Sequence, residues 1–166
     1  RQGTRTPAGD PVRGSVAQAI VRDLESRDLE AVVRIDSDRT GARKPDYWRG
    51  VFEDFLAGGG RRERIGLAVE RGGAVAGYLL GEVRAFEFGS EACGWVFSVG
   101  VAPDAGRGGI GSALLHEACR RFRALGVLQV RTMVRRNDVP VTAFFRSNGF
   151  VGGSFAQLEL ELGDER

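Results

Sequence analysis

A glycine-rich segment, VGVAPDAGRGGIGSALLHEAC from Val99 to Cys119, contains the residue types of an anion-binding turn. An apolar run breaks at Pro103, and the glycines that follow give way to an alanine- and leucine-rich helical pattern. Glycine lets consecutive backbone N–H groups converge on one point, and the start of the following helix adds its positive end. We therefore expect this turn to bind a phosphate or diphosphate, with Arg107 as a mobile cation at its rim.

Known phosphate-binding motifs fit this segment only in part. Gly106, Gly108 and Gly111 match the G-x-G-x-x-G pattern of dinucleotide-binding domains. Such domains place the pattern after their first strand, with an acidic residue about 20 positions on. Here several expected strands precede the glycines, and Arg131 stands at the acidic position. An NAD-binding fragment and a purely structural turn remain alternatives, whereas a P-loop would require a Lys-Ser/Thr pair after Gly111.

The elements that position this turn follow from apolar periodicity and from glycine and proline breaks. The sequence predicts strands at 19–22, 64–70, 74–86, 92–101, 127–134 and 150–162, and helices after Ser26 and at 45–56, 110–125 and 139–147. The last strand is indicated by the alternation of Leu158, Leu160 and Leu162. This order predicts a mixed α/β (α+β) fold with a largely antiparallel central sheet flanked by helices. We expect residues 1–14 to be a flexible arm and residues 15–166 to be a single domain.

Composition and charge narrow the function classes. A formal net charge of +2 is too small to indicate nucleic-acid or membrane binding by itself. Cys93 and Cys119 are expected to be buried free thiols, and His116, the only histidine, is expected on a helix surface. No metal-ligand spacing is present, and no apolar run is long enough for a membrane span. We expect a cytoplasmic protein without a bound metal.

Two blocks of this sequence resemble the GNAT acetyltransferase superfamily. The family signature is a strand ending V-x-P followed by R/Q-x-x-G-x-G/A at the start of a helix, and here it reads Val101-Ala102-Pro103 and then 106–111, GRGGIG. The second block, N…A…Y-x-x-x-G-F, is RNDVPVTAFFRSNGF from Arg136 to Phe150. The resemblance spans roughly 21–162 and includes both blocks at the proper separation.

This resemblance implies a fold with two splayed central strands and acetyl-CoA in the gap between them. Val99 and Val101 would offer backbone groups to the pantetheine arm and to the developing oxyanion, and residues 106–112 would hold the diphosphate. Asn137 or Asp138 would lie at the end of the other splayed strand, and Phe144 and Phe145 near the thioester and the pantetheine. The implied donor-binding residues are Val99, Val101, Gly106, Arg107, Gly108, Gly109, Ile110, Gly111, Ser112, Asn137, Phe144 and Phe145.

The sequence departs from the family pattern at two positions. Gly106 stands where the family has Arg or Gln, and we expect Arg107 to substitute in part. Phe145 stands where many members have a tyrosine that protonates the departing thiolate. Thiolate is a tolerable leaving group near neutral pH, so this loss should slow turnover without forbidding it. Glu91, at the start of the strand at 92–101, and Glu82, on its neighbour, are the candidate general bases.

The acceptor amine is expected to bind against the first two helices and their connecting loop. The polar and aromatic residues that cluster there are Asp36, Asp38, Arg39, Arg43, Asp46, Tyr47 and Trp48. Trp48 is better explained by packing of its helix on the sheet. The sequence thus predicts acetyl transfer from acetyl-CoA to a primary amine of a small molecule or a protein, by direct attack in a ternary complex. A non-catalytic acyl-CoA-binding or regulatory module is the alternative, and a homodimer is left open.

Overall fold

The computed structural model describes residues 19–60, 62–106 and 108–163. The chain divides into two compact units, one ending at Arg131 and one beginning at Thr132, and each is described by itself. The arm expected at 1–14 lies outside the described residues. None of the helices in the described ranges combines the length and apolarity needed to cross a membrane.

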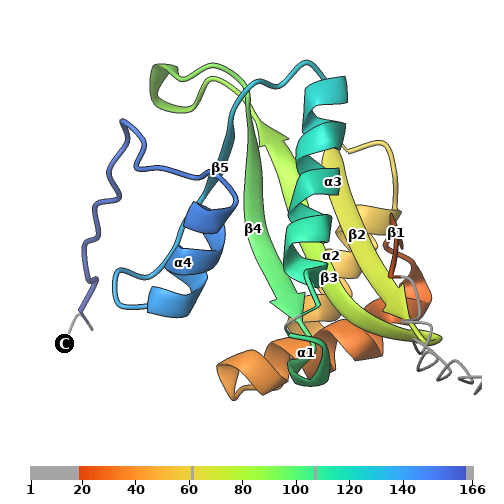
Figure 1. Cartoon of the computed structure of the whole chain (residues 1–166). Coiled ribbons are helices and arrows are strands. Elements are labelled where there is room, and N and C mark those ends of the chain that lie inside the picture. Colours follow the sequence, from red (N-terminus) through yellow and green to blue (C-terminus); the bar gives the residue numbers. More distant parts are fainter. Residues whose placement is uncertain (1–18, 61, 107, 164–166) are drawn as a thin grey trace, which may run out of the picture. The chain divides into compact units, whose positions relative to one another are not determined.

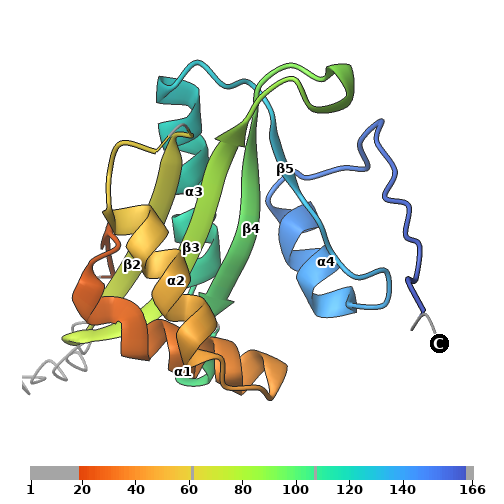
Figure 2. The same cartoon turned by 180° about the vertical axis from the view of Figure 1, so that it is seen from behind.

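The first unit is a largely antiparallel sheet with helices on both faces (Figures 1 and 2). Its elements are β1 (Ile20–Asp23), α1 (Leu29–Thr40), α2 (Pro45–Leu56), β2 (Arg64–Arg71), β3 (Ala74–Arg84), β4 (Cys93–Val101), α3 (Ile110–Ala124) and most of β5 (Val130–Thr132). The strand order is β1-β2-β3-β4-β5, and the pairs from β1 to β4 are antiparallel. The prediction of a mixed fold with a largely antiparallel sheet is confirmed.

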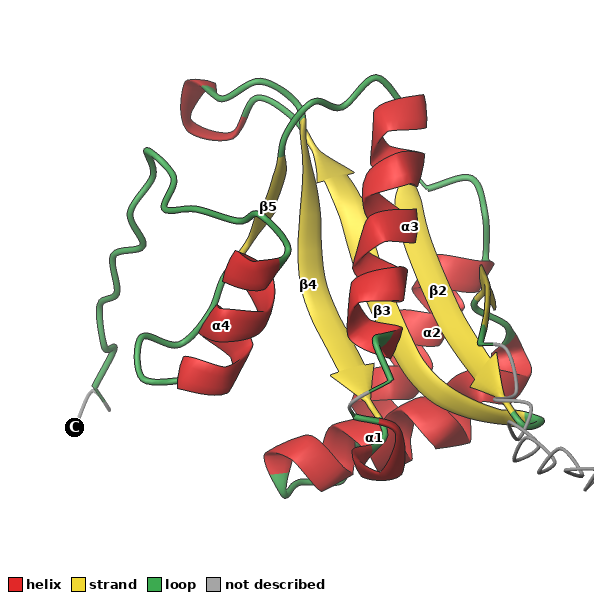
Figure 3. Ribbon diagram, viewed as in Figure 1, coloured by secondary structure: helices red, strands yellow, loops and turns green. Residues whose placement is uncertain are grey.

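Helix α3 packs on one face of the sheet, and α1 and α2 pack on the other (Figure 3). The close approach of α3 depends on Gly94 in β4, because a Cβ there would lie 2.7 Å from Cγ of Phe122. The Phe122 ring can therefore lie directly on the strand backbone. The sheet continues from β4 to β5, because the Gly94 N–H donates a hydrogen bond to the carbonyl of Gln129, just before β5, at 2.8 Å.

Helix α2 has the predicted bounds, and its apolar stripe faces the sheet. Pro45 occupies the first turn, where a missing N–H is not needed for helical bonding. Trp48 and Phe52 are buried, and the Trp48 ring contacts Tyr78 of β3 edge-on, with 5.4 Å between ring centroids. The expectation that Trp48 packs its helix on the sheet is confirmed.

The predicted final strand at 150–162 is wrong. Residues 151–163 form no helix or strand, and Leu158, Leu160 and Leu162 are 92%, 83% and 87% exposed. The alternating leucines define an apolar edge, but a strand also needs a partner for its backbone hydrogen bonds. The described part of the second unit contains α4 (Val139–Ser147) and only the end of β5, so it offers no such partner of comparable length.

Candidate active site

The glycine turn leads from the end of β4 into α3. A short 3-10 turn at Pro103–Ala105 redirects the chain, and Gly109 then adopts a φ of 72°, which favours glycine. Gly109 provides no side chain to cap α3, and the first N–H groups of a helix have no partner within it. The described predicted residues of this turn, namely Gly106, Gly108, Gly109, Ile110, Gly111 and Ser112, thus lie together at one helix start. Arg107 lies outside the described residues.

Arg71 lies against this turn and was not found by sequence reasoning. It is the last residue of β2, and its Nη1 is 2.9 Å from the position that a Cβ on Gly108 would occupy. The guanidinium therefore lies directly beside the backbone of Gly108. The available signal was topological. β2 and β4 run in the same direction, because each is antiparallel to β3 between them, so their carboxyl ends lie at the same end of the sheet.

A β-bulge in β4 lies upstream of the turn. Leu80 pairs with Ser98 and the next residue of β3, Gly81, pairs with Val96, so Phe97 is an extra residue in β4. A bulge interrupts the ladder and leaves the extra residue unpaired in it. Val99 and Val101, the two predicted contacts for the pantetheine arm, follow on the same strand and are both half-buried.

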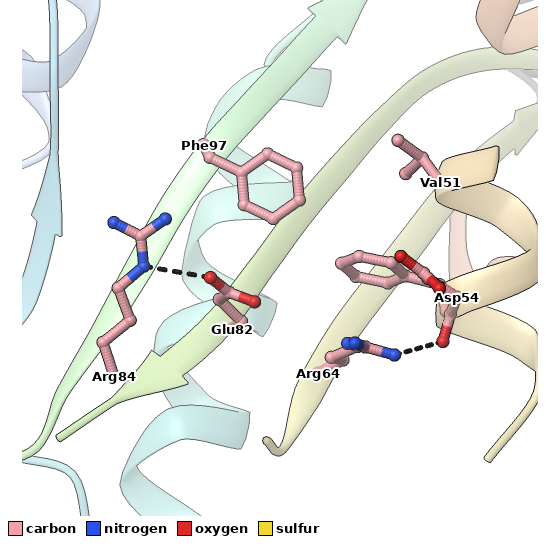
Figure 4. Close-up of a pocket in the computed structure, with 7 residues that line it drawn as sticks. Val51, Asp54, Arg64, Glu82, Arg84 and Phe97 are labelled. Carbon is pink, nitrogen blue, oxygen red and sulfur yellow. Dashed lines mark hydrogen bonds and ion pairs between the residues drawn. The ribbon is translucent and has the colours of Figure 1, made fainter. Parts of the chain in front are cut away.

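Two hollows flank Phe97 on the α1/α2 face of the sheet. The first, called the Arg64 hollow, has a volume of about 220 Å³ and is lined by Val51, Asp54, Phe55, Arg64, Glu82, Arg84 and Phe97 (Figure 4). The second, called the Asp36 hollow, has a volume of about 270 Å³ and is lined by Asp36, Arg39, Lys44, Tyr47, Trp48, Phe97 and Ser98. The bulged Phe97 is thus common to both, and its ring contacts Phe55 of α2 at 5.7 Å between centroids.

The two candidate bases have different surroundings. Glu82 lines the Arg64 hollow, where its Oε1 accepts hydrogen bonds from Arg84 Nε at 2.9 Å and Arg62 Nη1 at 3.1 Å. Two guanidinium groups therefore already engage this carboxylate. Glu91 precedes β4, is exposed and lines neither hollow. The structure brings Glu82, and not Glu91, to a cavity beside β4.

Asp36 organises the second hollow. Its buried carboxylate accepts hydrogen bonds from Trp48 Nε1 at 3.0 Å and pairs with Lys44 Nζ at 2.9 Å. Burial alone would raise the pKa of Asp36, but the bonds from Trp48 and Lys44 outweigh it and hold this pKa below its usual value. The carboxylate is therefore ionised near neutral pH and ties α1 to α2.

Only part of the predicted acceptor cluster lines a hollow. Asp36, Arg39, Tyr47 and Trp48 line the Asp36 hollow, whereas Asp38, Arg43 and Asp46 line neither. Arg43 instead pairs with Glu30 and Asp46 with Arg49 at the surface. These surface ion pairs explain Arg43 and Asp46 without a role in binding an acceptor amine.

Ser98, which lines the Asp36 hollow, forms a polar contact with the buried Tyr78. The Ser98 hydroxyl donates to the Tyr78 hydroxyl at 3.3 Å. Burial raises the pKa of Tyr78, so the phenol stays protonated near neutral pH. Neither residue was singled out from the sequence, because their proximity depends on the bulge that places Ser98 opposite Leu80.

The second unit contains the remaining predicted donor-binding residues. The Asp138 carboxylate caps α4 by accepting a hydrogen bond from the Val141 N–H, and the backbone carbonyl of the preceding Asn137 accepts one from the Val139 N–H. Phe145 is buried and contacts Phe144 and Phe150, each at 5.1 Å between ring centroids. Phe145 therefore forms the apolar core of this unit, and it has no proton to donate.

Cysteine and histidine positions bear on redox and metal chemistry. Cys93 and Cys119 are free thiols; Cys93 is buried as expected, and Cys119 is half-buried. His116 lies exposed on α3, as predicted. Among the described residues, no cluster of three or more His, Cys, Asp or Glu side chains could hold a metal ion.

Comparisons with known proteins identify the family and support the fold. The model of the acetyltransferase (GNAT) family matches residues 29–150. Mycothiol acetyltransferase of Saccharomonospora viridis is 41% identical over 63 residues, which are 38% of this chain and 21% of that protein, so the chain spans about a fifth of this curated relative. Among solved structures, aminoglycoside 6'-N-acetyltransferase AAC(6')-Ig of Acinetobacter haemolyticus has a TM-score of 0.73 at 15% identity, over 87% of this chain and 99% of that one. AAC(6')-Iy in complex with CoA has a TM-score of 0.75 at 12% identity, over 91% and 98%. This chain belongs to the GNAT acetyltransferase family.

Proposed function

We propose that this protein transfers an acetyl group from acetyl-CoA to a primary amine of a small molecule. The observation that supports this most is that the glycine turn and the two hollows adjoin the same strand, β4. The glycine turn follows directly on β4, and the bulged residue of that strand, Phe97, lines two hollows. In this proposal, the turn binds the diphosphate and the hollows form the acceptor surface, and a single strand joins the two. Membership of the family and the CoA complex of a structural neighbour point to the same donor.

The donor is bound chiefly by backbone groups in this proposal. N–H groups at the start of α3 hold the diphosphate, because they lack helical partners and lie at the positive helix end. Arg71 adds a guanidinium beside Gly108 and so compensates for glycine at the family's Arg/Gln position, 106. Val99 and Val101 contribute backbone groups to the pantetheine arm. The roles of Asn137, Phe144 and Phe145 near the thioester rest on the family resemblance.

The reaction is a direct displacement. The neutral amine nitrogen attacks the thioester carbonyl carbon, the C–S bond breaks, and CoA leaves as the thiolate while the acetylated nitrogen loses a proton. Close approach in the ternary complex supplies much of the rate. Glu82 is the candidate acceptor for that proton, through water, once its pairing with Arg62 or Arg84 relaxes. The thiolate is protonated by solvent, because Phe145 provides no phenol.

The proposal is tested by combining binding and turnover. Isothermal titration with acetyl-CoA is expected to show saturable binding, and free-thiol release is expected to depend on an added amine. No binding of acetyl-CoA would refute the proposal. Binding without amine-dependent thiol release would instead support a non-catalytic acyl-CoA-binding module, which the phenylalanine at 145 and the double pairing of Glu82 favour. Protection of the fold by NAD and not by CoA would indicate a dinucleotide-binding fragment.

We also assign the protein to the cytoplasm. Cys93 and Cys119 are free, which agrees with a reducing compartment. A homodimer is proposed only as a state to be tested, by analytical ultracentrifugation with and without acetyl-CoA.

A further inference from the structure

The charges around Phe97 indicate which kind of amine this site accepts. Four cations line the two hollows, namely Arg39, Lys44, Arg64 and Arg84, together with three carboxylates, namely Asp36, Asp54 and Glu82. A fifth cation, Arg62, pairs with Glu82 from outside the lining. The two linings together carry one positive charge in excess, and within the Arg64 hollow two cations stand against two carboxylates.

The two most enclosed carboxylates are already paired. Asp36 is engaged by Lys44 at 2.9 Å and by Arg39 at 3.6 Å. Glu82 is engaged by Arg84 and Arg62 at 2.9 and 3.1 Å. A polycationic acceptor would have to displace these partners and would meet the remaining cations. Among the lining carboxylates that the structure describes, Asp54 alone has no ion pair, so the site offers a molecule with several ammonium groups one unpaired carboxylate.

Arg64 is the cation with the least compensation. Within the described residues no carboxylate lies at ion-pair distance from it, and its Nη1 donates to the backbone carbonyl of Asp54 (Figure 4). Its Cζ also lies 5.6 Å from the centroid of the Phe55 ring, which fixes the guanidinium at the wall of the hollow. Guanidinium has five N–H donors in a planar fork that matches a carboxylate. Arg64 therefore retains donors and charge for an anion.

We propose that the acceptor is a small amine that also carries a carboxylate, and that Arg64 binds this carboxylate. This inference rests on the proposed acetyl transfer and names the substrate class of its acceptor site. The apolar walls formed by Val51, Phe55 and Phe97 hold the carbon skeleton between the two ends. The amine then lies on the Phe97 side, next to the bulge of β4. Amino acids have this chemistry, whereas aminoglycosides and polyamines do not.

The test compares each amino acid with its own amide. Free-thiol release is measured with acetyl-CoA and a panel of amino acids, including β-alanine, L-glutamate and L-phenylalanine, against the corresponding carboxamides. Phosphoethanolamine, spermidine and kanamycin provide the phosphate and polycation arms. For the best acceptor we expect kcat/KM to exceed that of its amide by about tenfold, as an anion–guanidinium contact requires. R64Q should remove this preference and leave kcat/KM for the amide within about twofold.

The matched control is R49Q, because Arg49 lies on α2, is exposed and lines neither hollow. This variant should keep the wild-type preference, and both variants should keep the wild-type Kd for CoA. Preference for kanamycin, spermidine or phosphoethanolamine, equal use of acid and amide, or an equal loss for both in R64Q would overturn the inference. Binding of CoA with no thiol release for any amine would count against acetyl transfer itself and is distinguishable from these results.

Discussion

Substitution of Asp36 provides the most demanding test of how the acceptor side of the site is built. In Asp36→Ala, the buried Trp48 Nε1 loses its acceptor and Lys44 loses its ion pair. A hydrogen bond to a charged group contributes about 1.5–3 kcal/mol. Lys44 is 42% exposed, so its pair adds about 0–1 kcal/mol after screening. We therefore expect the free energy of unfolding to fall by about 3 kcal/mol.

Thermal and urea unfolding would measure this loss. For a domain of this size, 3 kcal/mol corresponds to a decrease in Tm of roughly 6–12 °C. Asp36→Asn retains an oxygen acceptor for Trp48 and should cost less than half as much. Asp46→Ala is the matched control, because its side chain is 90% exposed in its pair with Arg49, and it should change stability by less than about 0.5 kcal/mol. A loss below about 1 kcal/mol in Asp36→Ala would refute the role assigned to this carboxylate.

Acidification should reproduce part of the same effect. The folded-state pKa of Asp36 lies below its unfolded value, because hydrogen bonds from Trp48 and Lys44 outweigh burial. Its contribution to stability is therefore fully present above the unfolded pKa and is lost as the pH falls through the folded one. In Asp36→Ala, the acid limb of the stability profile should become shallower over that range. An unchanged limb would contradict the assigned pKa direction.

Three further predictions concern other parts of the chain. Gly94→Ala places a Cβ 2.7 Å from Phe122 Cγ and should lower the free energy of unfolding in urea by about 1–3 kcal/mol. The control Gly50→Ala, in open space on α2, should raise this free energy by about 0.5–1 kcal/mol. Equal effects of the two variants would contradict the packing of α3. Arg71→Gln should raise the Kd for CoA and for dephospho-CoA by about tenfold in isothermal titration and leave the kinetics with acetyl-pantetheine unchanged. The control Arg123→Gln should bind CoA as the wild type does. Wild-type affinity for CoA in Arg71→Gln would show that Arg71 is not part of the donor site. Hydrogen bonds from Arg120 and Arg121 lower the pKa of Glu117 from 4.5 to about 2. The contribution of Glu117 to the stability of the fold is therefore fully present above pH 4.5 and is lost as the pH falls from 4.5 to about 2. An NMR titration in which this carboxyl group titrates near its ordinary pKa would contradict the assignment.

The sequence specified elements whose signals are local. Pro45, the stripe containing Trp48 and Phe52, and the glycines that follow set the bounds of α2 without knowledge of the sheet. The glycine turn before α3 was equally readable, because a helix start and a glycine cluster stand next to each other in the chain.

Features that depend on a partner strand do not show in the local sequence pattern. The bulge at Phe97 exists only relative to β3, since the alternation within β4 alone does not reveal an extra residue. Arg71 reaches Gly108 through the fold of the hairpin, across 37 positions of the sequence. The leucine alternation at 150–162 indicated a strand, but no sufficiently long strand in the described part of its unit pairs with it.

Amide hydrogen exchange of residues 109–112, with and without CoA, tests the central claim most directly, because the Gly108 N–H already donates to the carbonyl of Ala105. These backbone N–H groups are proposed to bind the diphosphate, so their exchange should slow by about tenfold or more at saturating CoA. Exposed α2 amides should exchange as before, and NAD should have no effect. Unchanged exchange in the turn when CoA is bound would contradict the account.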